Sequence, residues 1–193
     1  MSGHGKYQRN RYFYGRLLTS DDFITEQTYF MEKHRLHNRY LHGCGVVEGF
    51  DVSIDERINI LVEPGSAIDC AGNLVVVDSR VQLGVPSGAG ELCIVVEYRE
   101  RPTEEVPALY ISSETDTAGG FSRILEEYCV SITDVNPNAN HSAIRQDTYG
   151  CGISHPTCIA RIQHGPKGWV LIQCGQRAVK HPLHGSVPGK TNG

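Results

Sequence analysis

The sequence lacks the long apolar stretches that carry a chain into or across a membrane. No uninterrupted apolar run among its 193 residues approaches the ~18 residues needed to span a bilayer. The first residues, Met1 to Arg11, are polar, and no apolar segment with the pattern of a secretory signal peptide follows them. The formal net charge is only −4, which does not favour nucleic acid as the partner of the whole chain. We therefore expect a cytoplasmic protein.

The motifs of several large enzyme classes are also missing. The chain has no GxSxG nucleophile elbow, no P-loop, no GxGxxG dinucleotide motif and no HExxH zinc motif. Phosphate, dinucleotide and nucleophile sites of those kinds are therefore not expected. The chain is predicted to be non-enzymatic.

The cysteines and histidines offer one candidate metal site. Seven cysteines are an odd number, and without an export signal they favour reduced thiols in a cytosolic compartment. Cys151, His155 and Cys158 are spaced closely enough to face one zinc ion, and a structural zinc is favoured over a catalytic one. Against this, the chain has no CxxC pair, and Cys158 begins an apolar strand in which it equally fits as an inward-pointing side chain. No other cofactor is expected.

A long helix is predicted close to the N-terminus. Thr19 and Ser20 offer capping hydroxyls, and two acids follow in the first turn. The stretch from Asp22 to Leu41 has neither glycine nor proline, and its apolar residues recur on roughly one stripe. Gly43 supplies the stop. The rise per residue gives a helix of about five turns.

After Gly43 the hydrophobic period changes from helical to β. Short apolar segments such as Leu74–Val77 alternate with turn residues, and the near-continuous apolar run Leu92–Tyr98 is typical of a central strand. Arg99–Pro107 is charged and contains two prolines, so it is predicted to be a loop or an edge. Ser122–Ile132 is ambiguous, and a strand is favoured.

These patterns predict a mainly β fold. We expect an antiparallel β-sandwich or barrel of about eight strands with one long N-terminal α-helix. The expected organisation is an N-terminal arm and helix at 1–43 that acts as a docking element, a β domain at 44–180 and a flexible tail at 181–193.

The segment Tyr7–Arg16 is dense in aromatic and basic residues. Residues 1–43 carry seven lysines and arginines against four acids, so their net charge is +3, whereas the remainder of the chain has a net charge of −7. Tyrosine and arginine are enriched at protein interface hot spots, and a basic arm suits an acidic neighbouring subunit. The same composition stacks single-stranded nucleic acid, but the acidic remainder favours contact with protein.

Residues 11–52 resemble a known group of proteins. Arg11–Phe23 reads RYFYGRLLTSDDF, and His37–Val52 reads HNRYLHGCGVVEGFDV. Both are similar to small proteins of phage tails and phage-tail-like contractile injection systems, whose pattern runs roughly R-Y-F-x-G-x-L-L-T-x-D-D-F and then H-N-R-x-L-H-G-x-G-V-V-x-G-L-x-V. Phe50 stands where leucine is usual in that group. The later Pro64–Gly72 run is similar to the next segment of the group, and beyond about residue 100 the likeness is thin.

The resemblance implies a structural subunit of a contractile particle, at the baseplate, the spike region or the fibre attachment. It supplies no catalytic residues. Its partners would be other subunits of the particle and further copies of itself, with ring-like or three-fold association, and no nucleic acid. Relatives often have a cysteine-rich patch in the later half, which Cys151 and Cys158 partly match. The residues expected at the interface are Arg9, Arg11, Tyr12, Tyr14, Arg16, Arg35, Asn38, Arg39 and His42.

Two other functions remain open at this point. A carbohydrate- or ligand-binding β module is suggested by the predicted sandwich and by Trp169, the single tryptophan. A zinc-stabilised protein or, further off, a zinc-dependent enzyme is suggested by the cluster at residues 151–158.

Overall fold

A computed structural model of the chain describes residues 7–56, 58–86, 90–107, 119–137, 153–166 and 168–174. The predicted mainly β fold with one long N-terminal helix is confirmed, and all strand pairs are antiparallel. Ten strands are found in the described ranges, where about eight were expected. The elements are α1 (Ser20–Leu41), β1 (Gly45–Gly49), β2 (Val52–Ile54), β3 (Asn59–Val62), β4 (Gly65–Ile68), β5 (Leu74–Val77), β6 (Val81–Gly84), β7 (Glu91–Pro107), β8 (Gly119–Thr133), β9 (Thr157–Gly165) and β10 (Gly168–Cys174).

Helix α1 begins and ends at the predicted signals. Thr19 is the N-cap and forms a capping box with Asp22, because each side chain accepts a hydrogen bond from the backbone amide of the other residue. At the other end Gly43 has a φ of 74°, and its amide donates to the Asn38 carbonyl over 3.1 Å. A left-handed residue of this kind is cheapest as glycine, which explains why the helix stops here.

The next six strands are the halves of three longer strands, each of which bends once. β1 continues into β2, β3 into β4 and β5 into β6, so the first half of the fold is a meander that forms two three-stranded sheets, in the orders β1-β4-β5 and β2-β3-β6. Phe50 lies at one bend with a φ of 57°, and its amide donates to the carbonyl of Pro64 at the next bend over 3.2 Å. Strands that bend and change sheets in this way form the corners of a curled sheet.

The third sheet has the order β10-β9-β7-β8, which places Leu92–Tyr98 in a central strand as predicted. β9 pairs with β7 only as far as Val96, whereas β8 follows β7 to Pro107. The β7–β8 hairpin therefore continues beyond the sheet as a two-stranded segment, residues 99–107 and 119–127, which we name the β7–β8 extension.

The prediction of a loop or edge at Arg99–Pro107 was right about the edge and wrong about the loop. The segment is a paired strand, and Pro102 lies opposite Ile124. Proline is tolerated because β9 no longer covers this part of β7, so that one edge of the strand is open. The strand favoured for Ser122–Ile132 is confirmed within β8.

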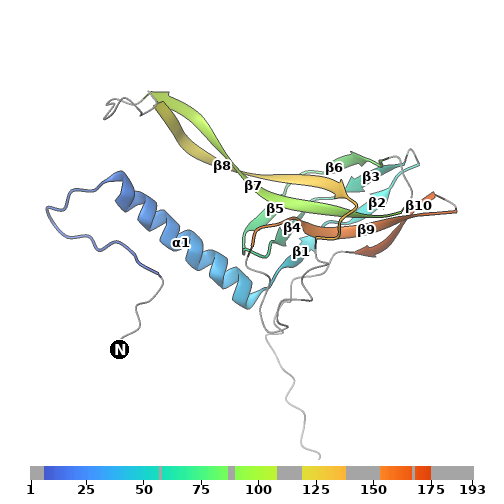
Figure 1. The fold of residues 1–193 in the computed structure, drawn as a ribbon, viewed down its shortest axis with the longest axis horizontal. Helices are drawn as coiled ribbons and strands as arrows, with labels where there is room; N and C mark the ends of the chain where they lie inside the picture. The colour runs from blue at the N-terminus through green and yellow to red at the C-terminus, as the bar shows by residue number, and fades with distance from the viewer. Residues whose placement is uncertain are drawn as a thin grey trace, which may run out of the picture.

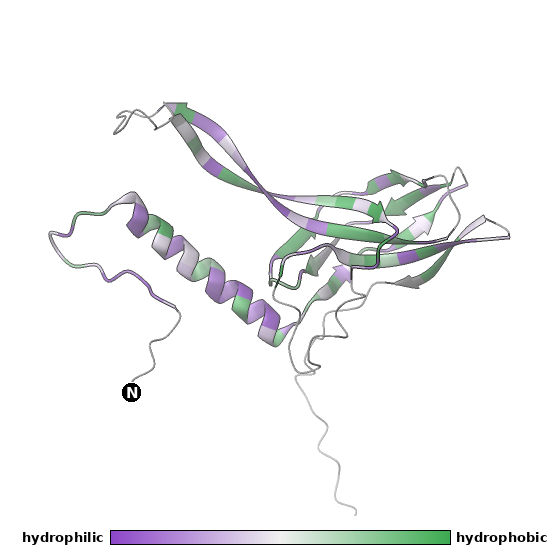
Figure 2. Cartoon of the chain, in the orientation of Figure 1, coloured by the Kyte–Doolittle hydropathy of each residue, from purple (hydrophilic) through white to green (hydrophobic). Residues whose placement is uncertain are grey.

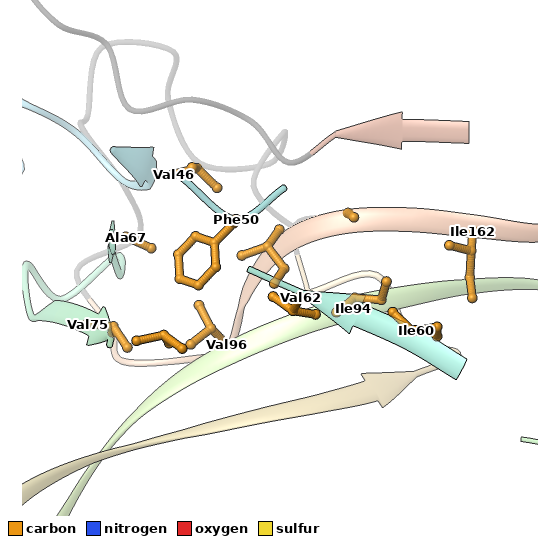
Figure 3. Packing of buried hydrophobic residues seen from close by; sticks show 12 residues of the cluster. Val46, Phe50, Ile60, Val62, Ala67, Val75, Ile94, Val96 and Ile162 are labelled. Atoms are coloured by element: carbon orange, nitrogen blue, oxygen red, sulfur yellow. The ribbon is translucent and has the colours of Figure 1, made fainter. Parts of the chain in front are cut away.

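The main core lies where the three sheets face one another. Phe50, Ile94, Val96 and Ile162 are buried there, and Figure 3 shows the Phe50 ring among side chains from the bent strands and β7. Hydrophobic residues are concentrated in these strands in Figure 2. The helix takes no part in this core, because Asn38 is its one buried residue.

Two elements project from the β domain in the same direction. Figure 1 shows α1 and the β7–β8 extension leaving the same side of the domain, both toward the upper left of the view. The N-terminal arm, residues 7–18, lies beyond and alongside the far end of α1. Both projecting elements are therefore placed where another polypeptide has access to them.

Candidate functional site

The N-terminal arm folds back along the helix but leaves most of its side chains in solvent. Asn10 donates to the backbone carbonyl of Asp22, Arg16 pairs with the Asp22 carboxylate, and the Tyr7 ring lies 5.0 Å from the ammonium nitrogen of Lys33. Four of the predicted interface residues are exposed in this conformation, namely Arg9, Arg11, Tyr12 and Tyr14, and the Tyr14 side chain is fully so. Arg16 is half-buried and is used inside the chain.

The carboxylate of Asp22 joins the arm to the helix. Its pKa is lowered, first by the hydrogen bond from the Thr19 amide and further by the Thr19 hydroxyl and the Arg16 guanidinium. A carboxyl group with a lowered pKa in the folded chain stabilises the fold above its ordinary pKa and loses that contribution as the pH falls through the folded value. The junction of arm and helix is therefore expected to loosen only in acid.

The helix itself exposes an unusual amount of apolar surface. Phe23, Ile24, Phe30 and Tyr40 each have more than half of their surface exposed. An isolated helix of this length is marginal in water, and most helices gain their stability from an apolar face packed on a core. Since α1 has one buried residue, most of its apolar surface is not packed on the described part of the chain.

Near its C-terminal end, α1 is seated on the turn between β4 and β5. The Asn38 amide donates to the Gly72 carbonyl over 2.9 Å, and Arg35 Nε donates to Asn73 Oδ1 over 2.6 Å. Asn73 is in turn fixed by Asp69, whose carboxylate accepts from both its backbone and its side-chain amide over 2.8 Å. This small polar seat fixes the direction in which the helix projects.

The seat corrects part of the expected interface. Asn38 was expected on the exposed side of the helix, but its side chain is 6% exposed because it hydrogen-bonds the turn. Arg35 is half-buried and also contacts Glu32 and Glu100, at 3.2 and 3.4 Å. Arg39 is half-buried, while His42 is exposed and its ring meets that of His37 edge-on. Whether these residues contact a partner stays a prediction.

A groove lies between α1 and the base of the β7–β8 extension. Its volume is about 300 Å³. The helix contributes Met31, His34 and Arg35, the β4–β5 turn and β5 contribute residues 72–76, and the hairpin contributes Tyr98, Glu126, Glu127 and Tyr128. One wall is therefore formed by the helix, and the opposite wall is aromatic and acidic.

Two cysteines meet beside the seat. Cys44 follows the end of the helix and Cys70 lies in the β4–β5 turn, with their sulfur atoms 2.8 Å apart. Cys44 is half-exposed, so a small disulfide such as oxidised glutathione has access to this pair. A second pair, Cys93 and Cys158, is buried with Val95. Burial is the main reason that the pKa of both of these thiols is raised, for Cys158 to about 12.

We expect oxidised glutathione to join Cys44 and Cys70 in a disulfide well before Cys93 and Cys158 react. Each disulfide formed consumes one molecule of oxidised glutathione and yields two of the reduced form, as both protein thiols are oxidised. Peptide mapping by mass spectrometry without reductant measures this, and Cys44→Ser is the control that removes the product. Faster oxidation of the buried pair would contradict the expectation.

The predicted zinc ligands are only partly within the described residues. Cys151 lies outside them, His155 Nδ1 is 2.8 Å from the Pro156 carbonyl oxygen, and Cys158 lies in the buried cluster with Cys93. Metal ligation requires a thiolate, which the raised pKa of Cys158 disfavours. In the ranges that the structure covers, no group of three or more metal-ligating residues is found. The zinc site stays a prediction.

Trp169, the residue behind the carbohydrate-binding alternative, is half-buried. Its ring packs against the main core and meets His164 edge-on, with 5.1 Å between the ring centroids. A tryptophan that stacks on a sugar presents an open face, and this one is occupied in part by its own fold. The described surface thus gives the carbohydrate-binding alternative no specific support.

Sequence analysis missed the residues that seat the helix. The seat depends on Asp69, Gly72 and Asn73, for which the sequence predicts no contact with the helix. A signal was present, because the spacing Asp-x3-Asn occurs at Asp69–Asn73 and also at Asp55–Asn59, and in both turns the aspartate accepts from the asparagine. The repeat indicates a structured turn, although not what packs on it.

Comparisons with known proteins do not identify the chain. No protein-family model and no curated protein matches it. Two solved structures with similar chains are described as the crystal structure of TssK and the baseplate complex from the type VI secretion system, each with a TM-score of 0.44 and 11% identity. They are matched over 86% and 87% of this chain, which spans 41% and 58% of theirs. A likeness at this level establishes neither a common fold nor a common function.

One negative finding bears on membranes. Within the described ranges, α1 is the one helix, and it is not apolar enough to cross a membrane.

Proposed function

We propose that this chain is a non-enzymatic assembly subunit of a phage-tail-like contractile particle, and that it binds neighbouring subunits through its N-terminal arm and α1. The observation that carries the proposal is the exposure of this element. A 22-residue helix with one buried residue, preceded by an arm with exposed tyrosines and arginines, is built to be completed by another polypeptide.

The kind of particle in this proposal is inferred from the sequence resemblance. The residues shared with tail proteins, 11–52, cover the exposed part of the arm, all of α1 and the first bend of the sheet. Within that segment the structural reasons for the pattern are clear for the capping box, Gly43 and Asn38. No such reason within the chain applies to Arg11, Tyr12 and Tyr14, which are exposed, and contact with a neighbouring subunit supplies one.

The test is co-sedimentation of the tagged chain with particles isolated from cells that make both. Wild-type chain is expected in the particle fraction, and the double variant Tyr12→Ser/Tyr14→Ser is expected largely in the free fraction. Loss of an aromatic hot spot costs about 2 kcal/mol or more, which is roughly 30-fold in affinity for each.

The matched control is Val135→Ser/Val170→Ser, which removes two exposed apolar side chains outside the arm and helix. It should sediment with the particle as the wild type does. The proposal is wrong if the tyrosine variant stays with the particle at the wild-type level, or if the wild-type chain occurs only as a free monomer.

A further inference from the structure

The groove between α1 and the β7–β8 extension has walls of different chemistry. Strand alternation places Glu100 and Pro102 of β7 on the same face as Glu126 and Ile124 of β8, and this face also carries Tyr98 and Tyr128, which line the groove. The three arginines of the extension, Arg99, Arg101 and Arg123, alternate onto the other face. Glu127 also lies on that other face, where it pairs with Arg101 at 2.7 Å. The face that looks toward α1 is therefore acidic and apolar, and the cation nearest to it is Arg35 of the helix, 3.4 Å from Glu100.

The helix wall of the groove carries exposed apolar side chains. Met31 lines the groove, and Phe23 lies two helical turns earlier on the same stripe of α1. Both are exposed, as is Ile124 across from them on the extension, at 66%. An occupant of this groove has to be apolar in the middle and positively charged where it meets Glu126 and, directly opposite it on the same face, Glu100.

The N-terminal arm has this composition. Residues 7–18 contain Arg9, Arg11 and Arg16, no acidic residue, and exposed Tyr12, Phe13, Tyr14, Leu17 and Leu18. Helix α1 is a poorer match, since four acids, Asp21, Asp22, Glu26 and Glu32, offset its three bases. The arm thus complements the groove in charge and in hydrophobicity better than α1 does.

The arm does not fill the groove of its own chain. Tyr7 and Gln8 line a separate hollow with Ile24, Thr28 and Tyr29, which shares no lining residue with the groove. The aromatic part of the arm lies beyond the N-terminal end of the helix, at the end farthest from the β domain (Figure 1). A 22-residue helix is about 33 Å long, so the arm is held well away from its own β domain.

We propose that the groove between α1 and the β7–β8 extension binds the N-terminal arm of a second copy of this chain. Arg9 and Arg11 of the arm lie against Glu100 and Glu126, and its tyrosines lie against the apolar walls. This contact joins two different surfaces, so it is head-to-tail and closes into a ring or extends into a filament. The proposal rests on the proposed function, because it names a partner for the same arm.

The test uses charge reversal in the full chain and sedimentation velocity over a concentration series. Wild type is expected to associate, while Arg9→Glu/Arg11→Glu and Glu100→Lys/Glu126→Lys are each expected to associate at least ~100-fold more weakly, because like charges then meet. Mixing the two variants should restore association to near the wild-type level, since the reversed arm of one then meets the reversed groove of the other.

The control Glu48→Lys/Asp51→Lys makes the same change of charge at exposed residues outside the groove lining and should associate as wild type does. Far-UV circular dichroism establishes that every variant is folded. A wild-type chain that stays monomeric overturns the inference, as does a mixture that fails to recover association. Neither result touches co-sedimentation with particles, so failure here and failure of the proposed function are told apart.

Discussion

The Gly72→Ala variant is expected to release α1 from the β domain while the sheets stay folded. Gly72 has a φ of +93°, and a Cβ there would collide with the carbonyl oxygen of Arg35 and lie 2.8 Å from its carbonyl carbon. These are helix backbone atoms, so the helix itself has to move. A left-handed residue with a Cβ costs about 1–3 kcal/mol, and loss of the buried Asn38 hydrogen bond costs about 1–3 kcal/mol more.

Hydrogen exchange measured by mass spectrometry follows this release. Amides of α1 are expected to exchange at least about 10-fold faster in the variant, since each 1.4 kcal/mol is a factor of ten. Amides of β3 and β7 should keep their wild-type rates, because Gly72 contacts neither of the clusters that hold those strands. The control is Gly84→Ala, at a glycine with no atom within 4 Å of the added Cβ. Unchanged protection of α1 in Gly72→Ala would show that the seat does not hold the helix.

The seat also explains how an exposed helix projects in a defined direction. Asn38 and Arg35 attach one end of α1 to the turn, Gly43 stops the helix at the domain, and the rest of α1 is unsupported by the main core. An element that is fixed at one end and not packed on the main core presents its apolar stripe without losing its orientation. Binding of a partner to such an element loses less conformational entropy than binding to a disordered segment would.

The helix could be predicted from sequence because its signals are local. Thr19, Asp22 and Gly43 act within a few residues of themselves, and the absence of glycine and proline between them extends the helix. The exposure of Arg9, Arg11, Tyr12 and Tyr14 was likewise predicted from composition. Asn38 was misplaced because its burial depends on a turn 34 residues away, and that distance leaves no periodic signal.

For the sheets, the sequence could predict the location of individual strands but not how they are arranged. Alternation located most of them, but not that three long strands each bend between two sheets, because a bend looks like a turn in the sequence. The β7–β8 extension was hidden by the prolines and charges of Arg99–Pro107, which are compatible with a strand only when its edge is open. The groove joins residues 31–35, 72–76 and 126–128, so it exists only once these long-range contacts are formed.

Replacing Phe50 by alanine is expected to destabilise the whole β domain, in contrast to the local effect at Gly72. Phe50 is 5% exposed, and its ring lies where the bent strands meet β7, beside Val46, Ala67 and Val96 in Figure 3. Removing a buried phenylalanine ring costs about 3–5 kcal/mol, because the cavity adds to the lost transfer free energy. Such a loss is a large fraction of the ~5–15 kcal/mol that typically stabilises a domain.

Comparison of Phe50→Ala with Phe50→Leu separates the contribution of ring packing to stability from the contribution of the backbone at the bend. Both substitutions keep a Cβ at a residue whose φ is 57°, so any backbone strain is common to them. Leucine, the residue usual at this position in the tail proteins that residues 11–52 resemble, fills most of the space and should cost less than ~1.5 kcal/mol. Urea unfolding followed by Trp169 fluorescence measures both. If the two variants lose stability equally, the bend is held by its backbone hydrogen bond to Pro64 and not by the ring.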